Sequence, residues 1–399
     1  MSSPVAPVCS LTLGPIPIAA AVIFFLLVGW PGAHGQTVSS STEIAVVETL
    51  RQHFHLRVEK IKGGWEGKVP ESGFTQRNLQ DAIPWLKQLR GLSQLSLTWS
   101  KEVVDLSPLG AISWLRELDL SRFRKPDLTQ LAGLKALERL TLNYCENLTS
   151  LNGIENLSAL NSLQLQECGA LVDIGALDSV STLIDLDLSG CTALVNVKGL
   201  NQSRALQSLD LMGCDKLQRI DSLAGALAIR SLNMQNCLVL ENIDAIGDLK
   251  ALVKLNLQSC RGLTSLVPLK ALSALQDLDI SLISRAAQQS EVLRGLVALR
   301  HLDLQGWDEL TNLDSLENMK ALRELNVSSS DRLVNLDSVK NLHALAILNL
   351  GGCKSLEDVA VLANITSLRQ LDLRGCSKIP AKTVAELKAI LPLCEIQVD

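Results

Sequence analysis

Residues 137–165 read LERLTLNYCENLTSLNGIENLSALNSLQL, and this stretch decides the fold. It contains the pattern L-x-x-L-x-L twice, once from Leu137 and again from Leu160. The closing L-x-L alternates apolar and polar residues, which predicts a short strand with one buried face. Between the two copies, apolar residues recur at every third position, at Leu148, Leu151, Ile154 and Leu157. That period favours 3₁₀ turns or extended segments over an α-helix.

The same pattern recurs to the end of the chain and gives 14 copies. The first positions of successive copies differ by 23, apart from one step of 22 and one of 24. No copy can bury its leucines alone, so stacked copies must share one core. The copies start at Leu92, Leu115, Leu137, Leu160, Leu183, Leu206, Ile229, Leu252, Leu275, Leu299, Leu322, Leu345, Leu368 and Leu391. In the last copy, Cys394 replaces the middle leucine and Ile396 the final one.

One copy is irregular. After Ile280 the chain reads SLISRAAQQSEVL, which holds the extra residue of the longest step. This segment lacks apolar residues at every third position, so it predicts a bulged loop over Ser284–Ser290 on the convex side. Simple decay of the repeat is the alternative to a functional loop.

The repeat resembles the leucine-rich repeat family over about three quarters of the chain. Its short period is similar to internalin-type and phosphatase-regulator-type repeats, and less like the long-helix repeats of ribonuclease inhibitor. The resemblance implies an α/β solenoid, a curved rod of about 14 rungs. Its concave side would be a parallel β-sheet and its convex side 3₁₀ turns or extended segments.

Composition excludes several classes of protein. The 399 residues are 47% hydrophobic but only 3% aromatic, which disfavours sandwich and propeller cores and excludes disorder for most of the chain. A net charge of −5 argues against nucleic-acid binding, because neutralising phosphates needs a basic surface.

A solenoid needs its two apolar ends covered. We expect an N-terminal capping region over residues 36–91, repeats over 92–378 and a C-terminal cap over 379–399. The first cap should hold a helix over Thr42–Phe54 with Thr42 as N-cap, a strand at Leu56–Ile61 and a second helix near Asn78–Leu89. In the second, a helix should start at Pro380 and run to Ile390, followed by a strand over Leu391–Val398.

The N-terminal segment 1–35 indicates export. No Lys, Arg, Asp or Glu precedes Glu43, and residues 11–30 are almost wholly apolar. Ala33-His34-Gly35 supplies the small residues that a signal peptidase reads, which predicts cleavage before Gln36. The alternative is an uncleaved membrane anchor through residues 11–30, since that run is long enough to span a bilayer. No Cys lies between Cys9 and Cys145, so the cysteine-bonded flanks of extracellular eukaryotic relatives are missing.

Eight cysteines share one position of the repeat, L-x-x-L-x-L-x-x-C. They are Cys145, Cys168, Cys191, Cys214, Cys237, Cys260, Cys353 and Cys376. In the family this inward position is Asn or Cys and satisfies backbone groups at the bend. A disulfide ladder would need converging Cβ vectors and a metal site a tetrahedral cluster, whereas stacked rungs give a line. We therefore expect buried free thiols with a structural role. Other residues fill this position at Phe123, Ile283, Trp307 and Ser330.

Nothing in the sequence predicts catalysis, a cofactor or a metal. Common nucleophile, phosphate-loop and zinc motifs are missing, and His53 and His55 have no third ligand at a suitable spacing. We therefore interpret the chain as a non-enzyme.

Two columns of the expected concave face are candidates for partner binding. The residues between the two strand leucines include Asp119, Asp187, Asp210, Asp279, Asp303 and Asp372, with Glu395 in the last copy. Stacked carboxylates would favour a basic partner, although Asp or Asn at this position is common in the family.

Further along each copy, the second column reads Trp99, Arg122, Tyr144 and Glu167, then mostly Gly or Ser. Trp, Tyr and Arg dominate the energetics of interfaces, so Trp99, Arg122 and Tyr144 form a candidate contact patch. Packing under the N-terminal cap is the alternative.

These patterns leave three hypotheses. The first is a monomeric, secreted or cell-surface solenoid that binds a protein ligand for adhesion, recognition or signalling. The second is an intracellular scaffold, such as a phosphatase regulator or a ubiquitin-ligase substrate receptor, which the free thiols favour. The third is a hydrolase inhibitor that uses the acidic column. Asn-x-Ser/Thr motifs, candidate glycan sites in a eukaryotic secretory setting, occur at Asn147, Asn156, Asn201, Asn326 and Asn364.

Overall fold

The computed structural model describes residues 40–70, 73–100, 102–124, 126–283 and 289–399. The chain divides into two compact units, Met1–Ala45 and Val46–Asp399. The apolar segment 11–30 and the predicted cleavage site at Gln36 lie outside the described residues. Within the described ranges, no helix is both long and apolar enough to cross a membrane.

One sheet of 16 strands runs through the described part of Val46–Asp399, with its strands in sequence order. β1 (Arg57–Ile61) and β2 (Gly64–Lys68) form an antiparallel hairpin, and β2 then pairs in parallel with β3 (Leu92–Ser96). The remaining strands are all parallel: β4 (Glu117–Asp119), β5 (Arg139–Thr141), β6 (Ser162–Gln164), β7 (Asp185–Asp187), β8 (Ser208–Asp210), β9 (Ser231–Asn233), β10 (Lys254–Asn256), β11 (Asp277–Asp279), β12 (His301–Asp303), β13 (Glu324–Asn326), β14 (Ile347–Asn349), β15 (Gln370–Asp372) and β16 (Glu395–Gln397).

The register follows the repeat. The middle leucine of each copy pairs with that of the next, for example Leu118 with Leu140 and Leu140 with Leu163. β11 and β12 also pair in phase, Leu278 with Leu302, although the step between them is the longest of the repeat. The extra residue therefore lies outside the strands. Most of the predicted loop Ser284–Ser290 lies outside the described residues.

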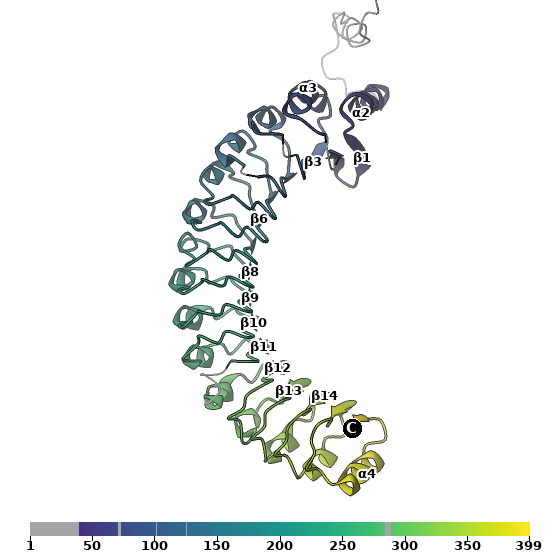
Figure 1. Cartoon of the computed structure of the whole chain (residues 1–399), viewed down its shortest axis with the longest axis vertical. Helices are drawn as coiled ribbons and strands as arrows, with labels where there is room; N and C mark the ends of the chain where they lie inside the picture. The colour runs from purple at the N-terminus through teal and green to yellow at the C-terminus, as the bar shows by residue number, and fades with distance from the viewer. Residues whose placement is uncertain (1–39, 71–72, 101, 125, 284–288) are drawn as a thin grey trace, which may run out of the picture. The chain divides into compact units, whose positions relative to one another are not determined.

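Short 3₁₀ helices return the chain from one strand to the next. Viewed alone, Val46–Asp399 is an arc with the strands on its inner side and these turns on its outer side (Figure 1). They are η1 (Ser107–Ile112), η2 (Leu128–Leu131), η3 (Ile154–Asn156), η4 (Gly175–Ser179), η5 (Asp221–Gly225), η6 (Asp244–Asp248), η7 (Val267–Ala271), η8 (Ser290–Gly295), η9 (Asp314–Leu316), η10 (Asp337–Asn341) and η11 (Ala360–Asn364). The predicted leucine-rich repeat solenoid, with its parallel concave sheet and 3₁₀ convex side, is confirmed.

A single aliphatic core fills the arc. In each rung the strand leucines and the apolar residues at every third position are buried, as Leu140, Leu142, Leu151 and Ile154 illustrate. Burying one such side chain stabilises the fold by about 1.5–3 kcal/mol. Because each rung packs against its neighbours, the stability of the array comes from stacking.

The described residues also contain three α-helices. α2 runs over Ser40–Phe54, so Thr42 lies within the helix and the expectation that it is the N-cap is wrong. α3 covers Gln76–Leu86 and starts earlier than predicted, because Thr75 and Asn78 form a reciprocal capping box. α4 covers Ala381–Ile390 and directly follows Pro380, as predicted.

The register predicted for the last copy is wrong. Ile396, rather than Cys394, pairs with Leu371, and Gln397, rather than Glu395, pairs with Asp372. The physical reason is α4, which replaces a short 3₁₀ turn with an α-helix. An α-helix rises only about 1.5 Å per residue, less than a 3₁₀ turn, so more residues are needed to return the chain to the sheet.

Candidate binding surface

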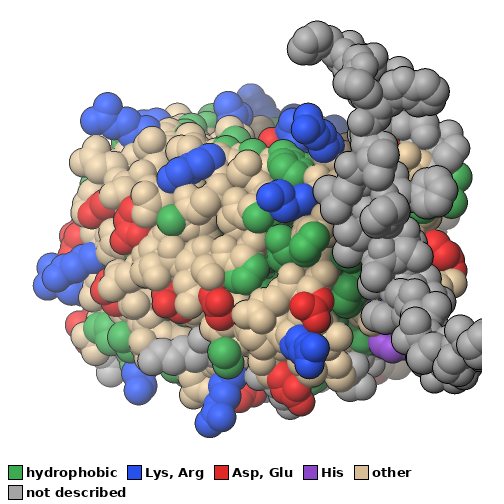
Figure 2. All heavy atoms as spheres, turned by 90° about the horizontal axis from the view of Figure 1, so that it is seen from above, with side chains coloured by type: hydrophobic (Ala, Val, Ile, Leu, Met, Phe, Trp, Pro, Cys, Tyr) green, Lys and Arg blue, Asp and Glu red, His purple; other side chains and the backbone are tan. Residues whose placement is uncertain are grey.

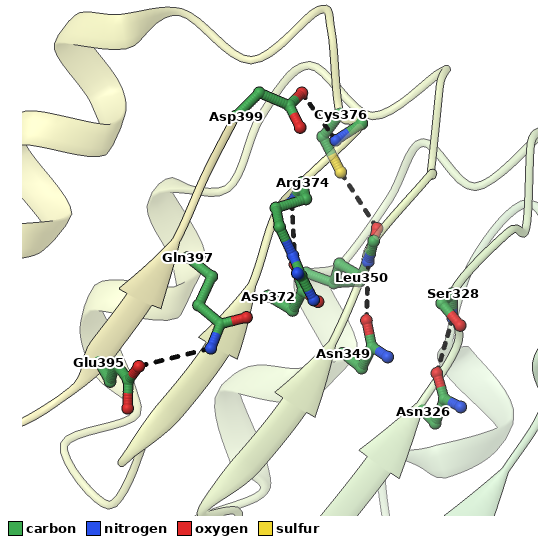
Figure 3. A network of polar contacts seen from close by, with 12 residues as sticks. Asn326, Ser328, Asn349, Leu350, Asp372, Arg374, Cys376, Glu395, Gln397 and Asp399 are labelled. Carbon is green, nitrogen blue, oxygen red and sulfur yellow. Dashed lines mark hydrogen bonds and ion pairs between the residues drawn. The ribbon is translucent and has the colours of Figure 1, made fainter.

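Most strands of the concave face end in a turn that uses the Asp or Asn between the two leucines; β3, β5 and β6 have Ser96, Thr141 and Gln164 there instead. The carboxylate of Asp187 accepts a hydrogen bond from the N–H of Ser189 at 2.8 Å. Asp303 accepts in the same way from Gln305, and Asn326 from Ser328, as Figure 3 shows for the latter. These Asx turns explain why the column prefers Asp and Asn, because the side chain satisfies a backbone donor at the bend.

The predicted acidic column is therefore not an open row of carboxylates. A second side chain satisfies several of its members: Asn233 donates to Asp210, and Asn326 donates to Asp303 at 2.9 Å. Burial raises the pKa of Asp210 and of Asp303 above the ordinary value. Hydrogen bonding to Arg374 instead lowers the pKa of Asp372 (Figure 3).

The six predicted aspartates do not form one site. Asp187 and Asp210 lie on neighbouring strands, and so do Asp279 and Asp303. Asp119 and Asp372 lie apart from both pairs; Asp119 accepts hydrogen bonds from Thr98 and Ser121. Figure 2, which views the molecule from above and not onto the concave sheet, shows acidic and basic side chains interspersed.

A different concave column was missed by the sequence analysis. The residues just before the middle leucines line a groove of about 540 Å³ over β9–β14. In it, the Nδ1 atom of His301 contacts Asp277, and its Nε2 atom lies 3.7 Å from Glu324. Lys254 lies 3.7 Å from the other oxygen of Asp277. These four residues recur at the repeat spacing, and this regular spacing is the signal in the sequence that could have identified the column.

The residue three positions after the Asx residue adopts a left-handed conformation in almost every rung. Gly occupies it in five later rungs, as at Gly190 and Gly213, and other residues occupy it in five more: Glu167, Asn236, Ser259, Leu282 and Ser329. Trp99, Arg122 and Tyr144 occupy it in three consecutive rungs, with φ angles of 66°, 65° and 60°. A positive φ is unfavourable for bulky residues, by roughly 1–2 kcal/mol each. The predicted Gly-rich stretch is thus a consequence of backbone conformation.

Trp99, Arg122 and Tyr144 form what we name the Arg122 stack. The guanidinium carbon of Arg122 lies 4.3 Å from the ring centroid of Trp99 and 4.3 Å from that of Tyr144. The three side chains meet because the backbone ladder continues past the strands: Arg122 donates to Asn143 and Tyr144 to Gln166. The rings remain 39% and 41% exposed, so the stack does not have the buried character of residues packed under a cap.

A hollow of about 490 Å³ lies beside the stack. It is lined by Trp99, Arg122, Phe123, Arg124, Tyr144, Glu146 and Asn147. Of the residues predicted to bind a partner, Trp99, Arg122 and Tyr144 line this hollow together, and Asp279 and Asp303 both line the groove over β9–β14.

The eight ladder cysteines are buried free thiols that bond the backbone of the preceding rung. Cys168 Sγ donates to the carbonyl of Leu142 at 3.1 Å, and Cys376 Sγ to that of Leu350 at 3.0 Å (Figure 3). Trp307 takes over this role through its ring N–H, which donates to Ile280 at 2.8 Å. Within the described residues, no group of three or more His, Cys, Asp or Glu side chains is placed to hold a metal ion.

Two solved bacterial structures share this fold. A leucine-rich repeat protein of Leptospira interrogans is 20% identical, with a TM-score of 0.55, over 78% of this chain and 91% of that chain. The functional domain of InlJ from Listeria monocytogenes, which includes a cysteine ladder, is 19% identical, with a TM-score of 0.57. That match covers 73% of this chain and 60% of the InlJ chain. No protein-family model matches the chain, and no curated protein sequence is significantly similar to it. At these identities the likeness shows the leucine-rich repeat fold alone.

Proposed function

We propose that this chain is a non-catalytic protein-binding solenoid and that the Arg122 stack is the centre of its contact surface. The observation that carries the proposal is the run of left-handed residues at Trp99, Arg122 and Tyr144. Five of the ten later rungs use Gly at the same position, so the backbone has an unstrained solution that these three rungs do not use. Strained residues with exposed aromatic rings are typical of functional sites rather than of packing.

The test is capture of a partner by wild-type protein and by a Trp99→Ala/Tyr144→Ala double variant. We expect the double variant to lose the partners that the wild type retains, because exposed aromatics supply much of the energy of an interface. The matched control is Val239→Ala/Val334→Ala, since these side chains are also exposed and belong to rungs that are not next to those of the stack. Equal capture by all three proteins would contradict the proposal, provided that their thermal unfolding shows all are folded.

We also propose that the protein is exported, with residues 1–35 removed before Gln36 or retained as an anchor through residues 11–30. The uncharged, apolar N-terminal segment supports this. The intact mass of the protein from its own cells tests it. A chain that starts at Gln36 supports a secreted or surface location, and a full-length chain that sediments with membranes supports an anchor.

The intracellular scaffold remains the second candidate. All nine cysteines in the described part of the chain are free thiols, which suits a reducing compartment. A full-length, soluble chain in the mass measurement would favour this function over export. The hydrolase-inhibitor hypothesis is weaker, because turns already engage the carboxylates on which it relies, as at Asp187 and Asp303.

We further propose that the repeats are of the short internalin-like or phosphatase-regulator-like type, with residues 36–91 and 379–399 acting as caps. The 3₁₀ helices, each of three to six residues, support the short type. The hairpin and α3 at one end, and α4 at the other, support the caps. A chain that ends at residue 378 should therefore aggregate, since it would expose the apolar end of the last rung.

A further inference from the structure

We propose that Arg122 is the anchor for a carboxylate of the protein partner, either an Asp or Glu side chain or a C-terminal carboxylate. This inference rests on the proposed protein-binding function and specifies the partner's chemistry. It reverses the expectation of a basic partner, which came from the acidic column.

The first step is the geometry of the guanidinium. Arg122 comes from the rung between those of Trp99 and Tyr144, and its guanidinium carbon is equally close to both rings. From these two distances and the order of the rungs, we infer that the group lies between the rings with one ring against each flat face. Guanidinium N–H groups lie in the plane of the group, so stacking leaves its edge available as a planar fork of donors.

Arg122 has no carboxylate as counter-ion in the described part of the chain. Several other arginines of the repeats pair with carboxylates of their own or neighbouring rungs, as Arg116 does with Glu138, Arg332 with Glu309, and Arg374 with Asp372. Within the described residues, no carboxylate lies within ion-pair distance of the Arg122 guanidinium, which contacts the two rings. A partly exposed fork of donors with no internal carboxylate is suited to an acceptor supplied by a partner.

The third step is the charge of the hollow beside the stack. Arg124 lines it together with Arg122, and Glu146 is the only acidic residue of the lining, which gives a net positive charge. A single planar carboxylate matches the fork through two parallel hydrogen bonds. Glu146 and Glu167, the next residue of the left-handed column, disfavour a polyanion such as nucleic acid or a sulfated glycan.

The test uses a library of random peptides selected on the full-length chain, with the Arg122→Gln variant as counter-selection. We expect the peptides that depend on Arg122 to contain an Asp, a Glu or a free C-terminus at one fixed position. Replacing that group by its amide should weaken binding by about tenfold or more. Arg122→Lys should lose most of the affinity as well, since Lys keeps the charge but not the fork.

Arg261→Ala is the matched control, because this exposed arginine lies on a distant rung. Binding lost in Trp99→Ala/Tyr144→Ala but kept in Arg122→Gln would overturn the carboxylate anchor and leave the proposed function intact. Binding unaffected by any of these variants would overturn both. Competition by heparin or inorganic phosphate, without competition by an acidic peptide, would overturn the carboxylate in favour of a phosphate or sulfate ligand.

Discussion

At the scale of single residues, one position decides how neighbouring rungs are joined. A ladder thiol donates to the carbonyl of the residue that directly follows the strand of the preceding rung, as Cys353 does to Val327 at 3.3 Å. Ser330 holds the same position, but its hydroxyl is buried and has no hydrogen-bond partner in the described part of the chain. A buried, unsatisfied hydroxyl costs roughly 1–3 kcal/mol.

Ser330→Cys should therefore stabilise the protein by about 1 kcal/mol. The longer C–S bond brings the donor towards the carbonyl of Leu304, which is the equivalent acceptor. Urea unfolding followed by circular dichroism measures the difference. The reciprocal variant Cys353→Ser should lose a similar amount of unfolding free energy. If Ser330→Cys instead destabilises the protein, the hydrogen bond of the ladder thiol does not explain the preference for Cys at this position.

A second residue-scale prediction concerns pH. Burial raises the pKa of Asp210, so its ionised form destabilises the fold above that pKa, and the penalty disappears below the ordinary value of 3.8. Asp210→Asn should therefore stabilise the protein at pH 7, by less than about 1 kcal/mol because the site is half exposed, and have no such effect at pH 3.

Asp372 should show the opposite sign. The hydrogen bond from Arg374 lowers its pKa, so the carboxylate contributes stability above 3.8 that is lost as the pH falls through the lowered value. Asp372→Asn should then destabilise the protein at pH 7 and have less effect at pH 3. Urea midpoints of both variants at the two pH values measure this, and effects of the same sign would refute the assignment.

At the scale of elements, the turn after each strand determines which residues are allowed. The Gly-rich column and the cluster of Trp99, Arg122 and Tyr144 are both apparent in the sequence. That both occupy one left-handed backbone position could not be predicted, because the identity of a side chain does not determine the φ angle. It also misplaced β16, since a ten-residue helix and a 3₁₀ turn use different numbers of residues to cover the same path.

Gly213→Ala tests the left-handed position alone. A Cβ at Gly213 would meet nothing closer than 3.9 Å, so the cost comes from the φ of 69° and should be about 1 kcal/mol. Gly169→Ala is the control, since its φ is not positive and its Cβ would lie at ordinary contact distance from Thr192. Chemical denaturation compares the two, and equal stabilities would remove the strain argument from the proposed function.

At the scale of the whole molecule, the sequence predicted the solenoid because its periodicity is uniform from Leu92 to Leu373. The site was less predictable. The repeat spacing places Trp99, Arg122 and Tyr144 in three consecutive rungs, so their proximity could be predicted. The contacts of His301 with Asp277 and Glu324 could not be predicted in this way, because they depend on which column of residues faces the groove.

The array should open from its ends, and the ladder thiols can report this. Burial raises the pKa of Cys214 to about 12, so its native thiol should resist alkylation at pH 8. The partly buried Cys394 should react first, then Cys376 next to the C-terminal end, and the central Cys214 last. Peptide mass spectrometry after timed alkylation measures the order. A common rate for all the ladder thiols would instead indicate all-or-none unfolding.

The order of the strands has a mechanical consequence. Because β1 to β16 follow one another without a crossover, each rung is held by the two beside it and by no distant part of the chain. Pulling on the two ends would therefore detach rungs one after another and extend the protein in small, similar steps. A solenoid of this kind would therefore act as a spring that lengthens gradually under force, whereas a β-sandwich would unfold in a single cooperative step.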